Sequence, residues 1–356
     1  MTATTRSRST WRADVVVIGL GAAGEQLAGG LAKAGFDVVG YEAARVGGEC
    51  PFVACVPSKS LLHDMNSGRE WAEAVSRRDR LANDRNDEQH AKGLIDAGVE
   101  LRREWASVDG ERRVAGPSGV VEASHVVLAT GARPIVPDVS GLDRPEVWTS
   151  ADALADSELP DRLLIVGGGP VGCEQAQVYR RFGTSVTLID HGDTVLGDVE
   201  PTVARGLETV LREDGIDVRL GFELRAVDDA ASGGIEASFA GIGTGSVVVD
   251  RLLLAVGVQP RLSDVGLDTI GLDSERVLVG TPPLDETPSF SLDPAPLPTL
   301  VCVARLGEVK GTHDLVAAAV PVLRDTSDLR LVLIGEDGWS ATAGRSMSEW
   351  LTTELI

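Results

Sequence analysis

The sequence DVVVIGLGAAG, residues 14–24, decides the fold of this chain. The letters DVVVI form an apolar strand, GLGAAG forms a tight turn, and a helix is expected from there to about Ala34. A second strand, residues 37–41, ends directly before Glu42. Strand, turn, helix and strand in this order make one βαβ unit.

The pattern occurs a second time later in the chain. A strand over 163–166 leads into the turn GGGPVG, residues 167–172, then into a helix expected to end near Phe182. The next strand, 186–189, ends before Asp190. Because strands alternate with helices along most of the chain, we predict an α/β fold with parallel sheets and helices on both faces.

Both glycine turns have the spacing that dinucleotide sites require. The first glycine makes the tight turn, the second lets backbone N–H groups approach a pyrophosphate, and the third lets the helix pack on the strand. The acid can accept hydrogen bonds from ribose hydroxyls. We predict two sites, formed by Gly19, Gly21, Gly24 and Glu42 and by Gly167, Gly169, Gly172 and Asp190. Two αβ units with glycine turns and no ligand remain the alternative.

Length, charge and cysteine content exclude several classes of protein. A chain of 356 residues is long enough for two or three domains. Its formal net charge of −21 disfavours binding to nucleic acids or anionic membranes. No apolar run approaches the roughly 18 residues of a membrane helix. Four cysteines are too few for a secreted disulfide scaffold, so we expect a cytoplasmic protein.

The stretch GGECPFVACVPSK, residues 47–59, follows the first βαβ unit and contains two cysteines. In an ideal helix the Cα atoms of Cys50 and Cys55 would be roughly 8–9 Å apart, whereas a disulfide needs about 4.4–6.8 Å. A disulfide therefore requires a distorted helix, which Pro51 and Pro57 favour, and a strained bridge is easily reduced. We predict redox chemistry here; two buried structural thiols are the alternative.

These motifs together resemble one enzyme family. The stretch 47–59, the two glycine turns, Ala129-Thr130-Gly131 and Leu254-Ala255-Val256-Gly257 are similar to the pyridine nucleotide-disulfide oxidoreductases. That family includes dihydrolipoamide dehydrogenase, glutathione reductase and mercuric reductase. The resemblance covers about residues 13–271. It implies FAD at the first turn and NAD(P)H at the second, with Gly48, Thr130, Gly131 and Gly257 also contributing to the cofactor sites.

The same resemblance assigns roles to the reactive residues. Cys50 meets the substrate and Cys55 lies against the flavin, while Lys59 and Glu174 pair beside it. Asp190 favours NADH, because an acid there would repel a 2′-phosphate. The implied activity passes electrons from NAD(P)H through FAD to the Cys50–Cys55 disulfide. The final acceptor is a small disulfide, a metal ion or a quinone, and no bound metal is expected.

The resemblance ends before the chain does. Nothing after Leu272 matches the family's flavin-closing A-x-G-D motif, and none of the five histidines is followed by Glu at the family's spacing. A family-type homodimer is therefore doubtful. Residues 298–339 instead resemble the start of the donor-nucleotide domain of retaining glycosyltransferases. A chimeric or truncated product that binds nucleotides without efficient turnover, or a nucleotide-sugar-binding glycosyltransferase fragment, remains the alternative.

We expect five segments along the chain. They are a disordered tail (1–12), an FAD-binding domain with the redox disulfide (13–150), an NAD(P)-binding domain (151–275), a proline-rich linker (276–298) and a partial glycosyltransferase-like αβ segment (299–356). Residues 66–113 are expected to be helical with a hairpin, and 149–161 to be a linker. In the last segment we expect strands over 299–303 and 329–334, a helix over 312–323 and a final helix from Ser346. We interpret Arg77-Arg78-Asp79-Arg80 as a solvated helix face, and Cys173 as a buried residue.

Overall fold

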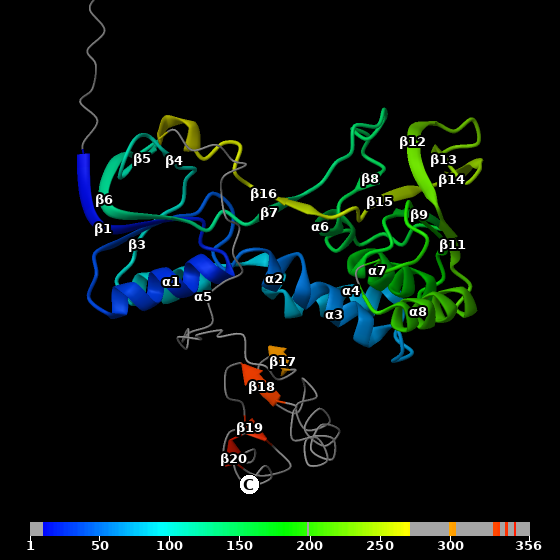
Figure 1. Ribbon diagram of the computed structural model, residues 1–356, viewed down its shortest axis with the longest axis horizontal. Coiled ribbons are helices and arrows are strands. Elements are labelled where there is room, and N and C mark those ends of the chain that lie inside the picture. Colours follow the sequence, from blue (N-terminus) through cyan, green and yellow to red (C-terminus); the bar gives the residue numbers. More distant parts are fainter. Residues whose placement is uncertain are drawn as a thin grey trace, which may run out of the picture. The chain divides into compact units, whose positions relative to one another are not determined.

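The computed structural model describes residues 10–197 and 199–270, together with four short strands at 299–303, 330–334, 339–340 and 345–346. The chain forms two compact units, 1–277 and 278–356. The first unit contains two large sheets with helices packed against each (Figure 1). Among the described residues, no helix is long and apolar enough to cross a membrane.

The first sheet has six strands in the order β3-β2-β1-β6-β5-β4. Strands β3, β2, β1 and β6 are parallel, and β5 and β4 continue the sheet with antiparallel pairing. The strands are β1 (Thr10–Ile18), β2 (Val38–Tyr41), β3 (Glu100–Arg102), β4 (Ser107–Val108), β5 (Arg113–Gly116) and β6 (Gly119–Leu128). Helices α1 (Ala22–Lys33) and α5 (Glu88–Asp96) share an apolar core with one face of this sheet.

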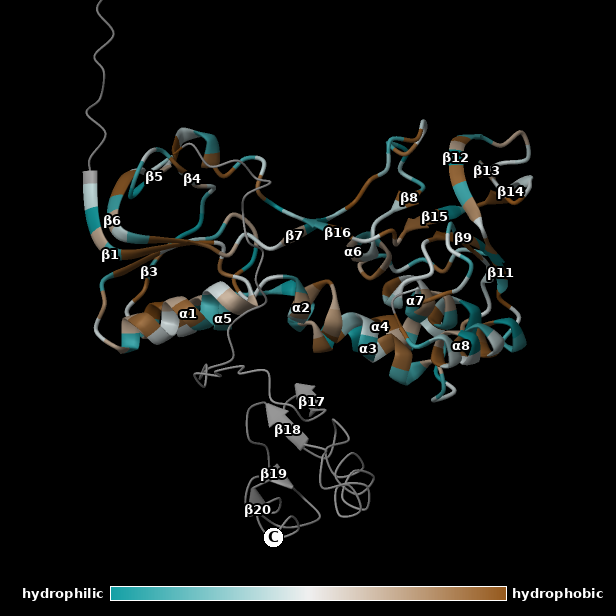
Figure 2. Cartoon of the chain, viewed as in Figure 1, coloured by the Kyte–Doolittle hydropathy of each residue, from teal (hydrophilic) through white to brown (hydrophobic). Residues whose placement is uncertain are grey.

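The second sheet has five parallel strands in the order β11-β10-β9-β15-β8. They are β8 (Val147–Trp148), β9 (Arg162–Val166), β10 (Ser185–Asp190), β11 (Asp217–Leu220) and β15 (Arg251–Leu254). Residues of α7 (Pro170–Arg181) and α8 (Pro201–Glu213) pack on one face. The hydrophobic colouring along β9 and β15 in Figure 2 follows this buried centre.

The other face of each sheet is covered by strands. In the first sheet, Val108 and Val114 lie in the sheet's own outer strands β4 and β5 and share a core with Val16 and Tyr41 of its centre. In the second, this role belongs to an antiparallel sheet of β12 (Phe222–Asp229), β13 (Ile235–Gly241) and β14 (Thr244–Val249). The expectation of helices on both faces is therefore wrong. Strands with alternating apolar residues bury a sheet face as well as a helix does.

A helical arm and a two-stranded crossing connect the two sheets. The arm consists of α2 (Glu49–Phe52), α3 (Cys55–Asp64), α4 (Trp71–Leu81) and η1 (Asn83–Arg85), and runs from α1 toward α7 (Figure 1). The crossing is the antiparallel pair of β7 (Ala132–Pro134) and β16 (Val258–Pro260). Leu61 and Ala74 of the arm share an apolar core with Val178 of α7.

Several sequence expectations need correction or lie outside the described residues. Strand β1 begins at Thr10, so residues 10–12 belong to the sheet and not to a tail. The expected linker 149–161 contains helix α6 (Ser150–Ala153), which Thr149 caps through the N–H of Asp152. The helices and hairpin expected over 66–113 are confirmed. Residues 1–9 and the proline-rich stretch 276–298 lie outside the described part.

Of the second unit, the structure describes two strand pairs. Strands β17 (Thr299–Val303) and β18 (Arg330–Ile334) are parallel neighbours, which confirms the two strands expected there. Strands β19 (Trp339–Ser340) and β20 (Arg345–Ser346) pair antiparallel, so Ser346, expected to begin a helix, lies in a strand. The helix expected over 312–323 lies outside the described residues, and the glycosyltransferase resemblance stays a prediction.

Candidate functional site

The first glycine turn leaves no space for a side chain at two positions. Gly19 has a φ of +91°, and a Cβ atom there would overlap the carbonyl oxygen of Ala129. A Cβ atom at Gly24 would overlap the carbonyl oxygen of Gly19. The turn therefore holds the start of α1 directly against the end of β1, as the glycine spacing predicts.

The second turn repeats these contacts. Gly167 has a φ of +111°, and a Cβ atom there would overlap the carbonyl oxygen of Ala255. A Cβ atom at Gly172 would overlap the carbonyl oxygen of Gly167. Ala129 and Ala255 each follow the strand that neighbours the first strand of their own βαβ unit. The short motifs ATG and LAVG therefore lie against the two glycine turns.

The two predicted acids also have matching partners. Each carboxylate accepts a backbone N–H from the residue after the first glycine and another from two residues beyond the acid. The bonds are Leu20 N–H and Ala44 N–H to Glu42, both 2.7 Å, and Gly168 N–H (2.6 Å) and Gly192 N–H (2.7 Å) to Asp190. Each acid is thus fixed beside its turn, where a ribose would meet it.

The two helix starts fit a pyrophosphate. Helices α1 and α7 have twelve residues each, and their N-caps, Gly21 and Gly169, make no side-chain capping bond to the described residues. The first-turn N–H groups and the positive end of each helix therefore face the loop. No described atom lies within 4 Å of where a Cβ of Gly169 would stand. The residues fit one dinucleotide at each turn.

Gly48 lies against the first turn. Its φ is +74°, and a Cβ atom there would stand 2.8 Å from the Cα atom of Gly21. The neighbouring Gly47 donates its N–H to the carbonyl oxygen of Leu20 at 2.8 Å. The segment that leads to the cysteines therefore starts directly on the predicted pyrophosphate loop.

The cysteine segment is a broken helix, as its spacing predicts. Cys50 lies in α2 and Cys55 begins α3. Between the helices, Val53 has φ −139° and Ala54 has φ −136°, neither of which is helical. The break brings Cys50 and Cys55 near each other, because a hydrogen bond with Cys55 is among the causes of the raised pKa of Cys50.

Both residues are exposed free cysteines. Partial desolvation of the sulfur raises the pKa of the Cys50 thiol to about 11, and the hydrogen bond and the nearby charge of Cys55 add to this rise. The positive charge of Lys59 acts in the opposite direction. Cys50 therefore holds its proton at neutral pH, and its reactivity rises with pH because the thiolate is the nucleophile.

Lys59 and Glu174 form the predicted ion pair. The Lys59 Nζ atom lies 2.6 Å from both carboxylate oxygens of Glu174, and the two residues are 115 positions apart. The pair joins α3, which begins at Cys55, to α7, which begins at the second glycine turn. Their side chains are 59% and 32% exposed, so the pair is partly solvated.

Thr130, Gly131 and Gly257 lie at the crossing between the sheets. Thr130 donates its hydroxyl to the carbonyl oxygen of Arg261 at 2.8 Å, and Arg261 donates its N–H to Gly131 at 3.0 Å. The carbonyl oxygen of Gly257 accepts the N–H of Ile135 at 3.0 Å. These three predicted cofactor residues therefore fix the crossing. Their contact with a cofactor stays a prediction.

The motifs gave no sign of a second charged contact beside the thiols. Arg261 also reaches Glu49, with Nη2 of the arginine 3.1 Å from Oε1 of the glutamate. Glu49 directly precedes Cys50 at the start of α2. These residues are 212 positions apart, so only the folded crossing brings them together.

The interpretation of Arg77-Arg78-Asp79-Arg80 as a solvated face is wrong for Arg78. Its side chain is fully buried and donates to the carbonyl oxygen of Asp156 at 2.7 Å. Trp71, at the start of the same helix, donates to the carbonyl oxygen of Ser157 at 2.8 Å and packs on Phe182. Helix α4 therefore packs against the part of the first unit that contains the second sheet. Cys173 is buried, as predicted.

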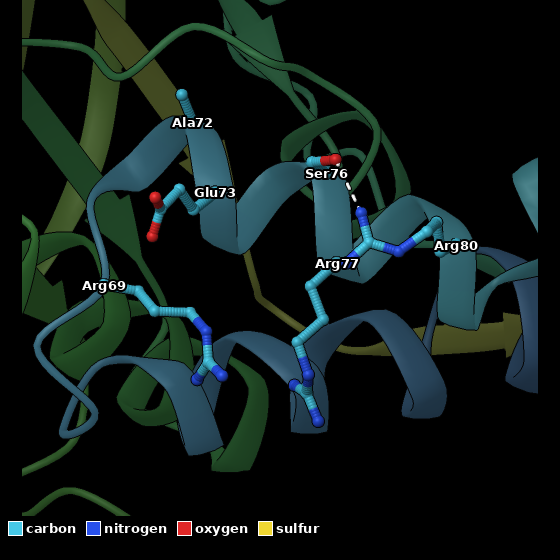
Figure 3. Close-up of a pocket in the computed structure, with 6 residues that line it drawn as sticks. All are labelled: Arg69, Ala72, Glu73, Ser76, Arg77 and Arg80. Carbon is cyan, nitrogen blue, oxygen red and sulfur yellow. Dashed lines mark hydrogen bonds between the residues drawn. The ribbon is translucent and has the colours of Figure 1, made fainter.

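A hollow of about 430 Å³ lies along α4 (Figure 3). It is lined by Arg69, Ala72, Glu73, Ser76, Arg77 and Arg80. Arg69 and Arg77 both donate to the buried Asp64, at 2.9 and 3.1 Å. The hollow contains no predicted site residue. Within the described ranges, no group of three or more His, Cys, Asp or Glu side chains is placed to hold a metal ion.

Known proteins resemble this chain over the residues that form the site. The profile of the pyridine nucleotide-disulphide oxidoreductases matches residues 13–279. A mercuric reductase of Streptomyces lividans is 33% identical over 283 residues, which cover 73% of this chain and 59% of that protein. A dihydrolipoyl dehydrogenase of Thermus scotoductus is 32% identical over 294 residues, which cover 73% and 60%.

Solved structures give the same result. The Cu(II) complex of the HOCl-induced flavoprotein disulfide reductase RclA from Escherichia coli aligns with a TM-score of 0.68 and 27% identity, over 74% of this chain and 60% of that one. This chain thus spans about 60% of the length of these relatives. Both glycine turns, both acids and the cysteine pair lie within the matched residues. The chain therefore belongs to the pyridine nucleotide-disulphide oxidoreductase family.

Proposed function

We propose that this chain binds FAD at the first glycine turn and NAD(P)H at the second, and passes electrons to Cys50 and Cys55. The family uses FAD and NAD(P)H. One observation carries the proposal: the cysteine segment starts on the first turn, through Gly48 against Gly21, and is joined to the helix of the second turn by Lys59 and Glu174. The segment that carries the thiols therefore has a contact with each proposed nucleotide site.

The chain's own residues would hold and orient the two nucleotides. Gly21 and the start of α1 receive one pyrophosphate, and Glu42 receives its ribose. Gly169, the start of α7 and Asp190 do the same for the nicotinamide nucleotide. When bound, FAD supplies the step that accepts a hydride and passes two electrons to sulfur.

The thiol step balances without a further reactant when the acceptor is a disulfide. Cys50, as thiolate, attacks one acceptor sulfur, forms a mixed disulfide and releases one acceptor thiol. Cys55 then attacks Cys50, which forms the Cys50–Cys55 disulfide and releases the second thiol. Two electrons and the two cysteine protons leave with the acceptor. The raised pKa of Cys50 makes its deprotonation a necessary part of this step.

Serine variants test the assignment of the two cysteines. In NADH-reduced protein, the Cys55 thiolate beside the flavin should give a long-wavelength charge-transfer absorption. The band should survive in Cys50→Ser and vanish in Cys55→Ser, while Cys173→Ser should leave the spectrum unchanged. The reverse pattern would exchange the two roles. Protein that binds no flavin would overturn the proposal as a whole.

We also propose that NADH is preferred to NADPH. The carboxylate of Asp190 is held at the end of β10 by two backbone N–H groups, and a 2′-phosphate beside it would be repelled. The test is to compare kcat/KM for the two nucleotides in the wild type and in Asp190→Ser. Equal values in the wild type would refute the preference, and the variant should weaken it.

The acceptor is proposed only as a class: a small disulfide, a metal ion or a quinone. Relatives named for mercuric ion and for dihydrolipoyl groups have similar identity to this chain, 33% and 32%. Two exposed thiols near each other can reduce a disulfide or bind a soft metal ion. The rates of NADH oxidation with lipoamide, Hg(II) and a benzoquinone would rank the three acceptor classes. Cys50→Ser should abolish only those reactions that pass through the thiols.

A further inference from the structure

A charged pair outside the motifs lies beside the first glycine turn. Nδ1 of His90, in α5, lies 2.8 and 3.0 Å from the two carboxylate oxygens of Glu25. Glu25 directly follows Gly24, and its N–H donates to the carbonyl oxygen of Gly21 at 2.8 Å. The side chains are 36% and 24% exposed, so the pair is partly shielded from water.

The imidazole of His90 also contacts the cysteine segment at two points. Its ring packs edge-on against Phe52, with 5.6 Å between ring centroids, and Phe52 is only 1% exposed. A Cβ atom on Gly47 would stand 2.9 Å from Nδ1 of His90, so the ring fills the space beside this glycine. His90 therefore lies against both ends of residues 47–52, which include Cys50.

Residues 47 and 48 in turn cover the first glycine turn, through the contact of Gly48 with Gly21 and the bond from Gly47 to Leu20. One histidine thus touches the first turn of α1, the turn that covers the pyrophosphate loop, and the helix of Cys50.

The contact between His90 and Glu25 lies where an anion would bind. The first turn of α1 attracts anions through its free N–H groups and its dipole. An unpaired Glu25 carboxylate in that turn would oppose a pyrophosphate. The contact with Nδ1 of His90 fixes this carboxylate against α5.

Several charged groups of the surrounding elements have partners of their own. In the loop after β2, Glu42 accepts two N–H groups and Arg45 donates to the carbonyl oxygen of Arg85. In α2, Glu49 pairs with Arg261. At the start of α5, Asp87 binds Arg103 and the N–H of Val46, and further along the same helix Lys92 pairs with Asp96. None of these pairs includes Glu25 or His90.

We propose that His90 is a positioning residue for the flavin site. By binding both carboxylate oxygens of Glu25 it ties α5 to the first turn of α1, and by filling the space beside Gly47 and Phe52 it holds the Cys50 segment on the pyrophosphate loop. This inference rests on FAD binding at the first turn. Removal of the imidazole should therefore loosen residues 47–52 and weaken FAD binding.

The test is FAD binding to the full chain freed of flavin, followed by flavin fluorescence at pH 7. His90→Gln should bind FAD about five- to tenfold more weakly than the wild type, the scale of one hydrogen bond. Glu25→Gln keeps a hydrogen-bonding group for Nδ1 of His90 and removes the charge, so it should bind FAD at least as strongly as the wild type.

Lys92→Gln is the matched control, because it removes a cation from the same helix at an exposed pair. It should bind FAD like the wild type. Wild-type affinity in His90→Gln, or a Glu25→Gln variant as weak as His90→Gln, would overturn the inference.

A second measurement separates this inference from the proposed function. In flavin-free protein, His90→Gln should exchange the amide hydrogens of residues 47–52 about tenfold faster than the wild type, whereas Lys92→Gln should not. If the chain bound no FAD, the proposed function would fail, yet this exchange would still test whether His90 holds residues 47–52 in place. Unchanged exchange in His90→Gln would overturn it.

Discussion

The two glycine turns are built alike at their ends and differently in the middle. In both, the first and third glycines leave no space for a side chain, and an acid accepts two backbone N–H groups. The second glycine differs, because Gly21 lies against Gly48 whereas Gly169 has no described atom within 4 Å of its Cβ position. The residue after the third glycine is Glu25 in one turn and the buried Cys173 in the other.

The different surroundings of Gly21 and Gly169 affect how long a nucleotide would stay bound at each turn. The cysteine segment covers the first turn, so a nucleotide there would have polypeptide on a second side. The second turn is open at Gly169, which suits a nucleotide that enters and leaves in each cycle. We infer that the first turn is built for a resident cofactor and the second for an exchanging one. The proposed assignment of FAD and NAD(P)H follows the same division.

The largest expected effect comes from Gly24→Ala and Gly172→Ala. Each new methyl group would overlap a carbonyl oxygen of its own turn, so each variant should lower the free energy of unfolding by about 3 kcal/mol or more. Urea denaturation measures the loss. Flavin retention should be lost in Gly24→Ala and kept in Gly172→Ala that still folds.

Helical glycines in open space provide the control. Gly30 in α1 and Gly206 in α8 have no described atom near the Cβ position. Their change to Ala should stabilise the protein by about 0.5–1 kcal/mol, because Ala favours a helix more than Gly does. Equal destabilisation by Gly24→Ala and Gly30→Ala would show that crowding in the turn is not the cause.

The second prediction compares Cys50, which follows the first glycine turn, with Cys173 in the helix of the second turn. Burial, with the charges of Asp190 and Glu174, raises the pKa of Cys173 to about 11, the same value that partial desolvation and Cys55 give Cys50. In reduced protein, alkylation of Cys50 by iodoacetamide should accelerate roughly tenfold per pH unit from 7 to 10, because the thiolate fraction grows. Cys173, only 2% exposed, should react only after unfolding.

The raised pKa of Cys173 also links stability to pH. The folded chain holds this proton more tightly than the unfolded chain. Its contribution to stability is therefore complete below about pH 9 and is lost as the pH rises toward 11. Urea unfolding at pH 8 and 10.5 should show this loss, and Cys173→Ala should make it smaller. An equal loss in the variant would assign the effect to other groups.

The third prediction concerns the acids. Glu42→Gln and Asp190→Asn each remove the charge from two N–H bonds of 2.6–2.7 Å. A hydrogen bond to a charged group contributes about 1.5–3 kcal/mol. Glu42→Gln should therefore weaken FAD binding at least about tenfold and change NADH binding little. Asp190→Asn should weaken NADH binding and change FAD binding little. Fluorescence titrations with each nucleotide measure both, and loss of both nucleotides in one variant would mean general unfolding.

Sequence reasoning found the parts of the site that local spacing determines. The glycine turns, the two acids and the break between Cys50 and Cys55 follow from strand ends, helix starts and helix geometry within a few dozen residues. Lys59 and Glu174 came from the family resemblance, because no local pattern links residues 115 positions apart.

Contacts made by the folded chain were missed. His90 reaches Glu25 across 65 positions, and Arg261 reaches Glu49 across 212. Arg78 was misjudged because charge on a helix face indicates solvent unless backbone carbonyls face it from another element. The strands that cover each sheet were missed for a similar reason, since alternating apolar residues show that a face is buried and not what buries it.

The smallest expected effect is at the pair that joins the two halves. Lys59 and Glu174 are partly solvated, so Lys59→Met and Glu174→Gln should each change the free energy of unfolding by at most about 1 kcal/mol. Their effects on Cys50 should have opposite signs. The charge of Lys59 lowers the pKa of Cys50, so its removal should slow alkylation of Cys50 at pH 8 about two- to threefold. Removal of the Glu174 charge leaves Lys59 uncompensated and should accelerate the same reaction. If both variants slow alkylation, the pair acts by placing α3 against α7, and the charge of Lys59 is not what tunes the thiol.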